Sequence, residues 1–163
     1  MKQLYIKQKV FSLSEKFTVK DQQERNVYYV EGSFMKVPKT FSIMNTNREE
    51  VALITKKMFS FLPKFSVEVN GQEVLTIKKE FSFFKARYTI DAAGIEVHGN
   101  WWDMDFQFLQ HGEIVGKVSK EWFAWGDSYK VQILNEEMES IIIALVVAID
   151  CVKADEAATS SAT

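Results

Sequence analysis

The sequence predicts a mainly β protein, an antiparallel barrel closed around one hydrophobic C-terminal α-helix. Residues 141–149 are apolar on every side, and a helix without a polar face has to be buried on every side. Residues 1–134 show short alternating strands separated by turn residues. Only a barrel of more than about eight strands has room for a helix in its lumen, so the helix favours a barrel over a sandwich.

Length and composition predict one domain, residues 1–153, followed by a disordered tail at 154–163 that is rich in Ala, Ser and Thr. The 163 residues are 47% hydrophobic, which is enough for one full-sized core. The single cysteine, Cys151, excludes an internal disulfide, and the N-terminus has no apolar signal segment. We therefore expect a cytoplasmic protein.

The expected strands follow period-two alternation from the N-terminus onward. They span residues 4–10, 26–34, 40–44, 51–58, 65–69, 74–78, 86–91, 94–98, 104–109, 113–118 and 128–134. Asn70-Gly71 predicts a type I′ hairpin, because both central residues of that turn need positive φ. Glycine-containing loops of three or four residues are expected at 92–94 and 110–112.

The helix is expected over about residues 136–152, opened by Asn135. Three glutamates lie in its first turn, where the helix dipole favours negative charge, and Asp150 is expected at the mouth of the core. The nine-residue apolar block 141–149 would be about 14 Å long, against a hydrocarbon core of about 30 Å. The sequence therefore predicts no transmembrane span.

Several stretches of the second half resemble the LURP-one-related proteins, including the bacterial YxjI-like members. They are GNWWDMDF at 99–106, GEIVGKVSKEW at 112–122, DSYKV at 127–131 and ALVVAID at 144–150. The resemblance covers about residues 4–153, but its earlier part matches mainly in pattern and in the opening LYIKQK at 4–9.

This resemblance implies the fold shared by tubby C-terminal domains and phospholipid scramblases, a barrel of about twelve strands around a central hydrophobic helix. Tubby domains bind phosphoinositide headgroups and scramblases act at membranes, whereas the biochemical role of LURP-one-related proteins is mostly unknown. No stretch matches the headgroup-binding residues of tubby, so none of those roles is transferred to a residue here. Fold kinship alone does not define function.

No catalytic constellation is visible, and we expect neither an enzyme nor a cofactor. His98 and His111 lie outside any HExxH spacing, and no phosphate-binding glycine loop is present. Asp103 and Asp105 are expected on one face of a strand, opposite Trp102, and could ligate a hard cation. Acids that keep an outer barrel face wet are the favoured interpretation, so no metal site is predicted.

The charges are distributed unevenly along the chain. Residues 1–90 carry 16 Lys and Arg against 9 Asp and Glu, a balance of +7, whereas residues 91–163 carry 4 against 13, a balance of −9. A basic face that attracts anionic headgroups is one interpretation, and solvated lysines that protect strand edges are the other. The residues of this face would be Lys36, Lys39, Lys56, Lys57, Lys78 and Lys79.

Tryptophans are the second candidate surface. Trp102 has the parity of inward-facing Met104, and Trp101 has the opposite parity. Trp122 and Trp125 are expected in a loop, where an indole could bind a ligand or a membrane interface, although packing over the barrel mouth is the favoured role.

The leading functional hypothesis is a non-enzymatic binding or scaffold module that binds anionic phospholipid or phosphoinositide headgroups at the membrane periphery through the lysines. A small-molecule or protein-binding module that uses the loop 122–125 is the alternative. Nucleic acid is not an expected partner, because the pI is near 5.8 and no nucleic-acid motif is present. Neither the ligand nor the oligomeric state follows from the sequence.

Overall fold

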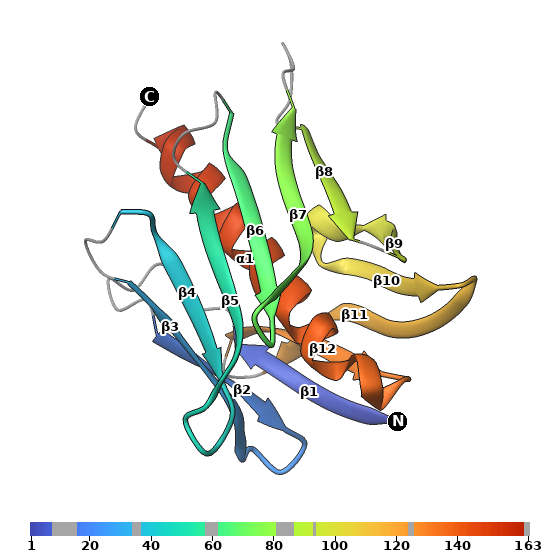
Figure 1. The fold of residues 1–163 in the computed structure, drawn as a ribbon. Helices are drawn as coiled ribbons and strands as arrows, with labels where there is room; N and C mark the ends of the chain where they lie inside the picture. The colour runs from blue at the N-terminus through green and yellow to red at the C-terminus, as the bar shows by residue number, and fades with distance from the viewer. Residues whose placement is uncertain are drawn as a thin grey trace.

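The computed structural model describes residues 1–7, 16–33, 37–57, 62–80, 87–92, 94–123 and 126–161. Twelve antiparallel strands form one sheet that curls into a nearly closed barrel, and a C-terminal helix packs against its inner face (Figure 1). The first six strands are β1 (Lys2–Lys7), β2 (Lys16–Asp21), β3 (Asn26–Gly32), β4 (Thr40–Met44), β5 (Glu50–Lys57) and β6 (Lys64–Val69). The other six are β7 (Gln72–Glu80), β8 (Arg87–Ala92), β9 (Ile95–Asn100), β10 (Asp105–Gln110), β11 (Glu113–Phe123) and β12 (Gly126–Ile133). The helices are η1 (Trp101–Asp103), η2 (Glu136–Met138) and α1 (Glu139–Ser161).

The predicted fold class is confirmed. Neighbouring strands in the sheet are consecutive in the chain, except that β1 pairs with β12 and joins the two ends of the strand sequence. β8 and β9 are therefore the two end strands of the sheet, and among the described residues β8 pairs with β7 alone and β9 with β10 alone. The hairpin expected at residues 92–94 is wrong, because the seam of the barrel falls at this turn.

Two other turns form the expected hairpins. Asn70 and Gly71 have φ values of 51° and 78° and join β6 to β7, as a type I′ turn requires. His111 and Gly112, with φ values of 51° and 81°, join β10 to β11. The second loop is thus two residues long, shorter than expected, because Gln110 already pairs with Glu113.

One strand was not predicted. β2 has a single fully buried side chain, Val19, and it is flanked by charged residues at both ends, so its alternation is short. The register nevertheless places Val19 opposite Ile6 of β1 and Tyr28 of β3, and all three side chains belong to the core.

The helix is central, as expected. Every side chain from Ile142 to Ile149 is at most 1% exposed, and Asn135 caps the preceding 3₁₀ turn by accepting a hydrogen bond from the Glu137 amide at 3.1 Å. Gly116 of β11 lets the helix approach the sheet, since a Cβ at this position would lie 2.9 Å from Cδ1 of Ile142.

Ion pairs hold both ends of α1 in the barrel. At its start, Glu139 accepts hydrogen bonds from Lys2 Nζ at 2.7 Å and from the Tyr28 hydroxyl at 2.6 Å. Burial and the neighbouring Glu139 carboxylate raise the pKa of the Tyr28 phenol above its usual range. At the other end, Lys56 pairs with Asp155 at 2.5 Å and Lys79 pairs with Glu156 at 2.8 Å.

These contacts explain a difference from the expected tail. α1 continues to Ser161, so residues 154–161, which were expected to be disordered, are helical. Alanine-rich composition favours helix, and the two ion pairs connect this part of α1 to β5 and β7. None of the helices in the described segments is long and apolar enough to cross a membrane.

Candidate functional site

The structure divides the six predicted lysines by the face of the strand on which they lie. Lys56 and Lys79 share the inward parity of Ile54 and Ile77, which is why they reach the carboxylates of α1. Lys57 and Lys78 have the opposite parity and are exposed on the outer face of the barrel.

The last two of the six are placed differently. Lys39 is half-buried beside β4, with Nζ 5.3 Å from the Phe41 ring centroid, and its carbonyl accepts from the Lys56 amide. Lys36 lies outside the described residues.

The sheet register brings a third lysine between the two exposed ones. Lys57 on β5 is the direct partner of Lys64 on β6, and Lys64 is the direct partner of Lys78 on β7. Directly opposed residues of an antiparallel pair have Cβ atoms about 4.5–5.5 Å apart. We call Lys57, Lys64 and Lys78 the lysine row.

Like charges in direct cross-strand register repel one another, so the lysine row has an electrostatic cost. Acidic side chains compensate the inner pair, Lys56 and Lys79, but no described carboxylate forms an ion pair with a member of the row. The row therefore presents three positive charges without an ion-pair partner among the described residues, with Lys57 and Lys78 exposed and Lys64 half-buried. The neighbouring row of that face carries the hydroxyls of Thr55, Ser66 and Thr76, of which Ser66 and Thr76 are buried, at 2% and 8% exposure.

Sequence reasoning missed Lys64 because of a β-bulge. The two-residue turn at Asn70-Gly71 sets Val69 opposite Gln72 and Glu68 opposite Glu73, and continuing that register would place Lys64 opposite Ile77. The register shifts between Val67 and Glu68, which moves Lys64 opposite Lys78. The bulge thus places the three lysines in one row, and no turn residue in the sequence predicts this bulge.

The prediction for Trp101 and Trp102 is reversed by the structure. Trp102 is 36% exposed, whereas Trp101 is half-buried and packs against the core. The reason is that Trp101–Asp103 form the 3₁₀ helix η1 and Met104 is left-handed, with φ of 57°, so strand parity does not extend across this segment.

The same irregularity separates the two aspartates that were expected side by side. Asp103 belongs to η1, where its amide and carboxylate bond to the Asn100 side chain, and Asp105 opens β10. Within the described parts of the chain, no group of three or more His, Cys, Asp or Glu side chains is arranged to hold a metal ion.

The other predicted aromatic pair is only partly covered by the structure. The backbone of Trp122 lies in β11, paired with Asp127 of β12, and not in the expected loop. The side chain of Trp122 and the whole of Trp125 lie outside the described parts.

The middle of α1 contains the one carboxylic acid with a strongly raised pKa among the described groups. Burial raises the pKa of Asp150 to about 6, and the nearby Lys153 ammonium opposes this shift. Burial lowers the pKa of Lys153, whose Nζ lies 5.7 Å from the Tyr129 ring centroid. Asp150 follows the fully buried stretch Ile142–Ile149, but Cys151 and Val152 beyond it are also buried, so the core does not end at this residue.

The histidines and the cysteine are not arranged as a nucleophile and base. His98 is exposed, and its Nε2 lies 2.8 Å from Oε2 of the exposed Glu96. His111 occupies the β10–β11 turn, and Cys151 is buried in α1. Both histidines are therefore on the outside of the strands, whereas the thiol belongs to the helix that fills the barrel.

The fold is thus a twelve-stranded barrel filled by its own C-terminal helix, with charged side chains on the outer faces of its strands. Residues 2–150 match the family described as LURP-one-related, and the chain belongs to this family. The family was thus identified correctly from the sequence motifs at 99–106 and 112–122.

Two known proteins are similar to this chain. One is the uncharacterized protein YxjI of Bacillus subtilis (strain 168), 31% identical over 152 residues that cover 93% of this chain and 94% of YxjI. The other is a protein from Arabidopsis thaliana with an X-ray structure, which has a TM-score of 0.60 and 11% identity and covers 92% of this chain and 91% of its own. The second likeness shows a shared fold. Family membership indicates a binding-type domain of uncharacterised ligand.

Proposed function

We propose that this protein is a non-enzymatic module that binds anionic phospholipid headgroups at a membrane surface through Lys57, Lys64 and Lys78. The observation that carries the proposal is the direct cross-strand register of these three lysines. A protein that neutralises its inner lysines with carboxylates and retains three opposed lysines outside gains stability when an external anion binds between them.

The position of the row supports binding to an extended surface. Its members come from three adjacent strands, so they lie side by side across the sheet and can contact several phosphates at once. Each lysine near an anionic leaflet contributes about 1 kcal/mol, so the row supplies about 3 kcal/mol, or about a hundredfold in the binding constant.

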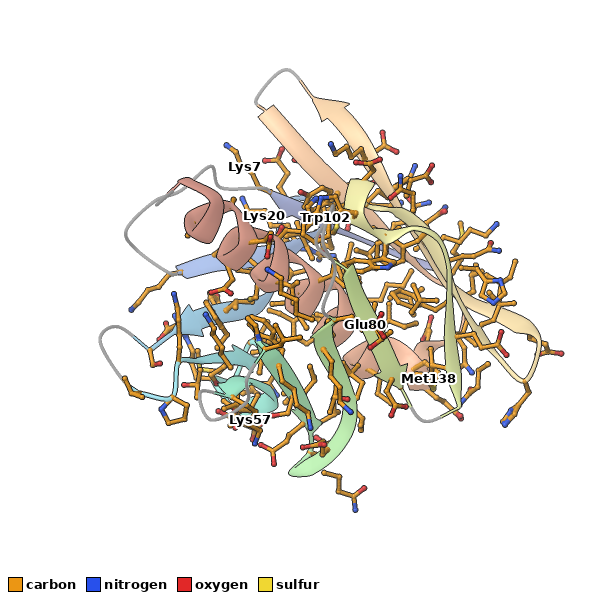
Figure 2. The ribbon with its side chains drawn as sticks, turned by 90° about the horizontal axis from the view of Figure 1, so that it is seen from above. Lys7, Lys20, Lys57, Glu80, Trp102 and Met138 are labelled. Atoms are coloured by element: carbon orange, nitrogen blue, oxygen red, sulfur yellow. The ribbon has the colours of Figure 1, made fainter. Side chains whose placement is uncertain are left out.

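The test is co-sedimentation with vesicles of graded phosphatidylserine content at low and physiological salt. Replacing Lys57, Lys64 and Lys78 together by Gln should weaken binding by about a hundredfold, and raising the salt should weaken wild-type binding because the Debye length falls to about 8 Å. A matched control replaces Lys7, Lys16 and Lys20 by Gln, which removes the same charge from β1 and β2. In Figure 2, Lys7 and Lys20 lie on one side of α1 and Lys57 on the other.

The outcomes separate a specific surface from general electrostatics. Binding that is lost in the row variant and kept in the control supports the proposal. Equal losses in both variants would show that total charge decides, and absence of wild-type binding at low salt would remove the proposal. A phosphoinositide-containing vesicle series then tests whether one headgroup is preferred.

A further inference from the structure

A second outer surface, on β9 to β12, forms a groove of about 400 Å³ that shares no strand with the lysine row. It is lined by ten residues of these four strands, and the outward-facing ones are polar. Gly99 allows it to form, because its φ of 113° suits glycine and a Cβ there would lie 2.8 Å from the carbonyl oxygen of Asp105. β9 therefore comes closer to β10 than a larger residue would permit.

The polar side chains are ordered in two rows. The first runs from His98 on β9 through Gln107 on β10 and Lys117 on β11 to Gln132 on β12, and each residue is the direct partner of the next. His98 is engaged with the exposed Glu96, and the other three form a donor row. The second row consists of Asn100 on β9, Asp105 on β10 and Ser119 on β11. Asp105 lies two residues from Gln107 and is the direct partner of Asn100, and Ser119 lies two residues beyond Lys117 on the same face. Asp105 supplies a carboxylate to this acceptor row.

The two charged members of the groove do not neutralise each other. Asp105 and Lys117 are diagonal neighbours across β10 and β11, a relation that separates two residues by about 7–8 Å, with their Cβ atoms somewhat closer. Both side chains are exposed, and neither forms an ion pair with any other described residue. A positive and a negative group thus face one groove with space between them.

We propose that this groove binds a small zwitterion, a molecule that carries an ammonium group beside a carboxylate or phosphate. The ligand's anionic end accepts hydrogen bonds from Lys117 and the flanking amides of Gln107 and Gln132. Its ammonium donates to Asp105 and to the Ser119 hydroxyl. No phenyl, phenol or indole ring is presented as a flat platform, because Phe106, the one such residue of the lining, is 4% exposed, and this favours a zwitterion over a sugar.

Free α-amino acids and phosphoethanolamine headgroups both have this chemistry. The test is NMR titration of the ¹⁵N-labelled full chain with L-alanine, O-phosphoethanolamine, acetate and methylammonium. Saturable shifts confined to residues 98–107, 117–119 and Gln132 are expected with at least one zwitterion. Acetate and methylammonium, which each carry one of the two charges, should bind at least about tenfold more weakly.

Two variants and one control test whether Lys117 binds the anionic end of the ligand and Asp105 binds its ammonium end. Asp105→Asn and Lys117→Met should each weaken zwitterion binding at least about tenfold, and Asp105→Asn should leave the weak response to acetate unchanged. Glu113→Gln removes an exposed carboxylate from β11 outside the groove and should have no effect. Replacement of the lysine row should also leave the titration unchanged.

Alanine binding identifies a free amino acid as the ligand class, and binding of phosphoethanolamine alone identifies the headgroup. The inference is overturned if neither zwitterion changes the chemical shifts of the groove residues or if acetate binds as tightly as the zwitterions. It is also overturned if the Asp105→Asn variant binds a zwitterion with wild-type affinity.

Discussion

Substituting Gly116 by Ala tests whether the helix is packed against β11 as closely as the structure shows. The added Cβ would lie 2.9 Å from Cδ1 of Ile142, 3.2 Å from Cδ2 of Phe108 and 3.3 Å from the Gln132 carbonyl oxygen. Overpacking of this kind costs about 1–3 kcal/mol, and the lower entropy of the unfolded Ala chain offsets about 0.4–1 kcal/mol. We expect a net loss of about 1 kcal/mol and a Tm lower by about 2–4 °C.

A double-mutant cycle identifies the clash as the cause. Ile142→Val removes the methyl group that meets the new Cβ, and alone it should cost about 0.5–1.5 kcal/mol. In the Gly116→Ala background it should cost at least about 0.5 kcal/mol less, because it relieves the contact. Ile143→Val is the control, since Ile143 is equally buried but none of its atoms is among the three nearest to the added Cβ.

Urea unfolding followed by circular dichroism measures the wild type and every variant of the two cycles. Additive effects of Gly116→Ala and Ile142→Val, or the same coupling with Ile143→Val, would refute the packing described here.

Two further predictions concern carboxylates of α1, Asp150 in its middle and Glu139 at its start. The raised pKa of Asp150, about 6 against an ordinary 3.8, means that the folded state binds the proton more tightly, so this group favours folding below about pH 4 and loses that contribution as the pH rises through 6. Asp150→Asn should therefore make the free energy of unfolding, measured in urea, less dependent on pH between pH 4 and 7.5, and should raise it at pH 7.5 by up to about 3 kcal/mol. An unchanged pH dependence in the variant would contradict this prediction. At the start of α1, Glu139→Gln should cost about 1–3 kcal/mol, since Lys2 and Tyr28 lose their charged acceptor, whereas the exposed Glu137→Gln should change stability by less than about 0.5 kcal/mol. Equal effects of the two glutamine variants would show that the Glu139 contacts contribute nothing specific.

The fold was predictable because its strongest constraint is local. Residues 141–149 have no polar face, and nothing short of a wide barrel buries such a helix among antiparallel strands. The features that the sequence did not predict depend on contacts with residues that are distant in the chain. Residues 154–161 are helical beside Lys56 and Lys79, contacts that no inspection of the alanine-rich tail alone can reveal.

The candidate site was predictable only in part, for the same reason. Lysine positions in the first half indicated a basic surface, but strand parity, which the sequence does contain, already separates inward Lys56 from outward Lys57. The role of Lys64 depends on the bulge at Val67, and the exposure of Trp102 depends on the left-handed Met104. Both are irregularities that interrupt the alternation of inward- and outward-facing side chains along a strand, so the alternating pattern of the sequence cannot locate them.

The buried helix also decides where binding can occur. Ile142 to Ile149 fill the space inside the barrel at no more than 1% exposure, so a ligand of this domain has to meet the outer faces of strands or the barrel mouths. On those outer faces the antiparallel register arranges side chains in rows across the sheet, and a row of one charge suits an extended anionic surface. Two adjacent rows of opposite character, as in the groove on β9 to β12, suit a small molecule that carries both charges. The two surfaces can therefore be tested independently, since neither shares a residue with the other.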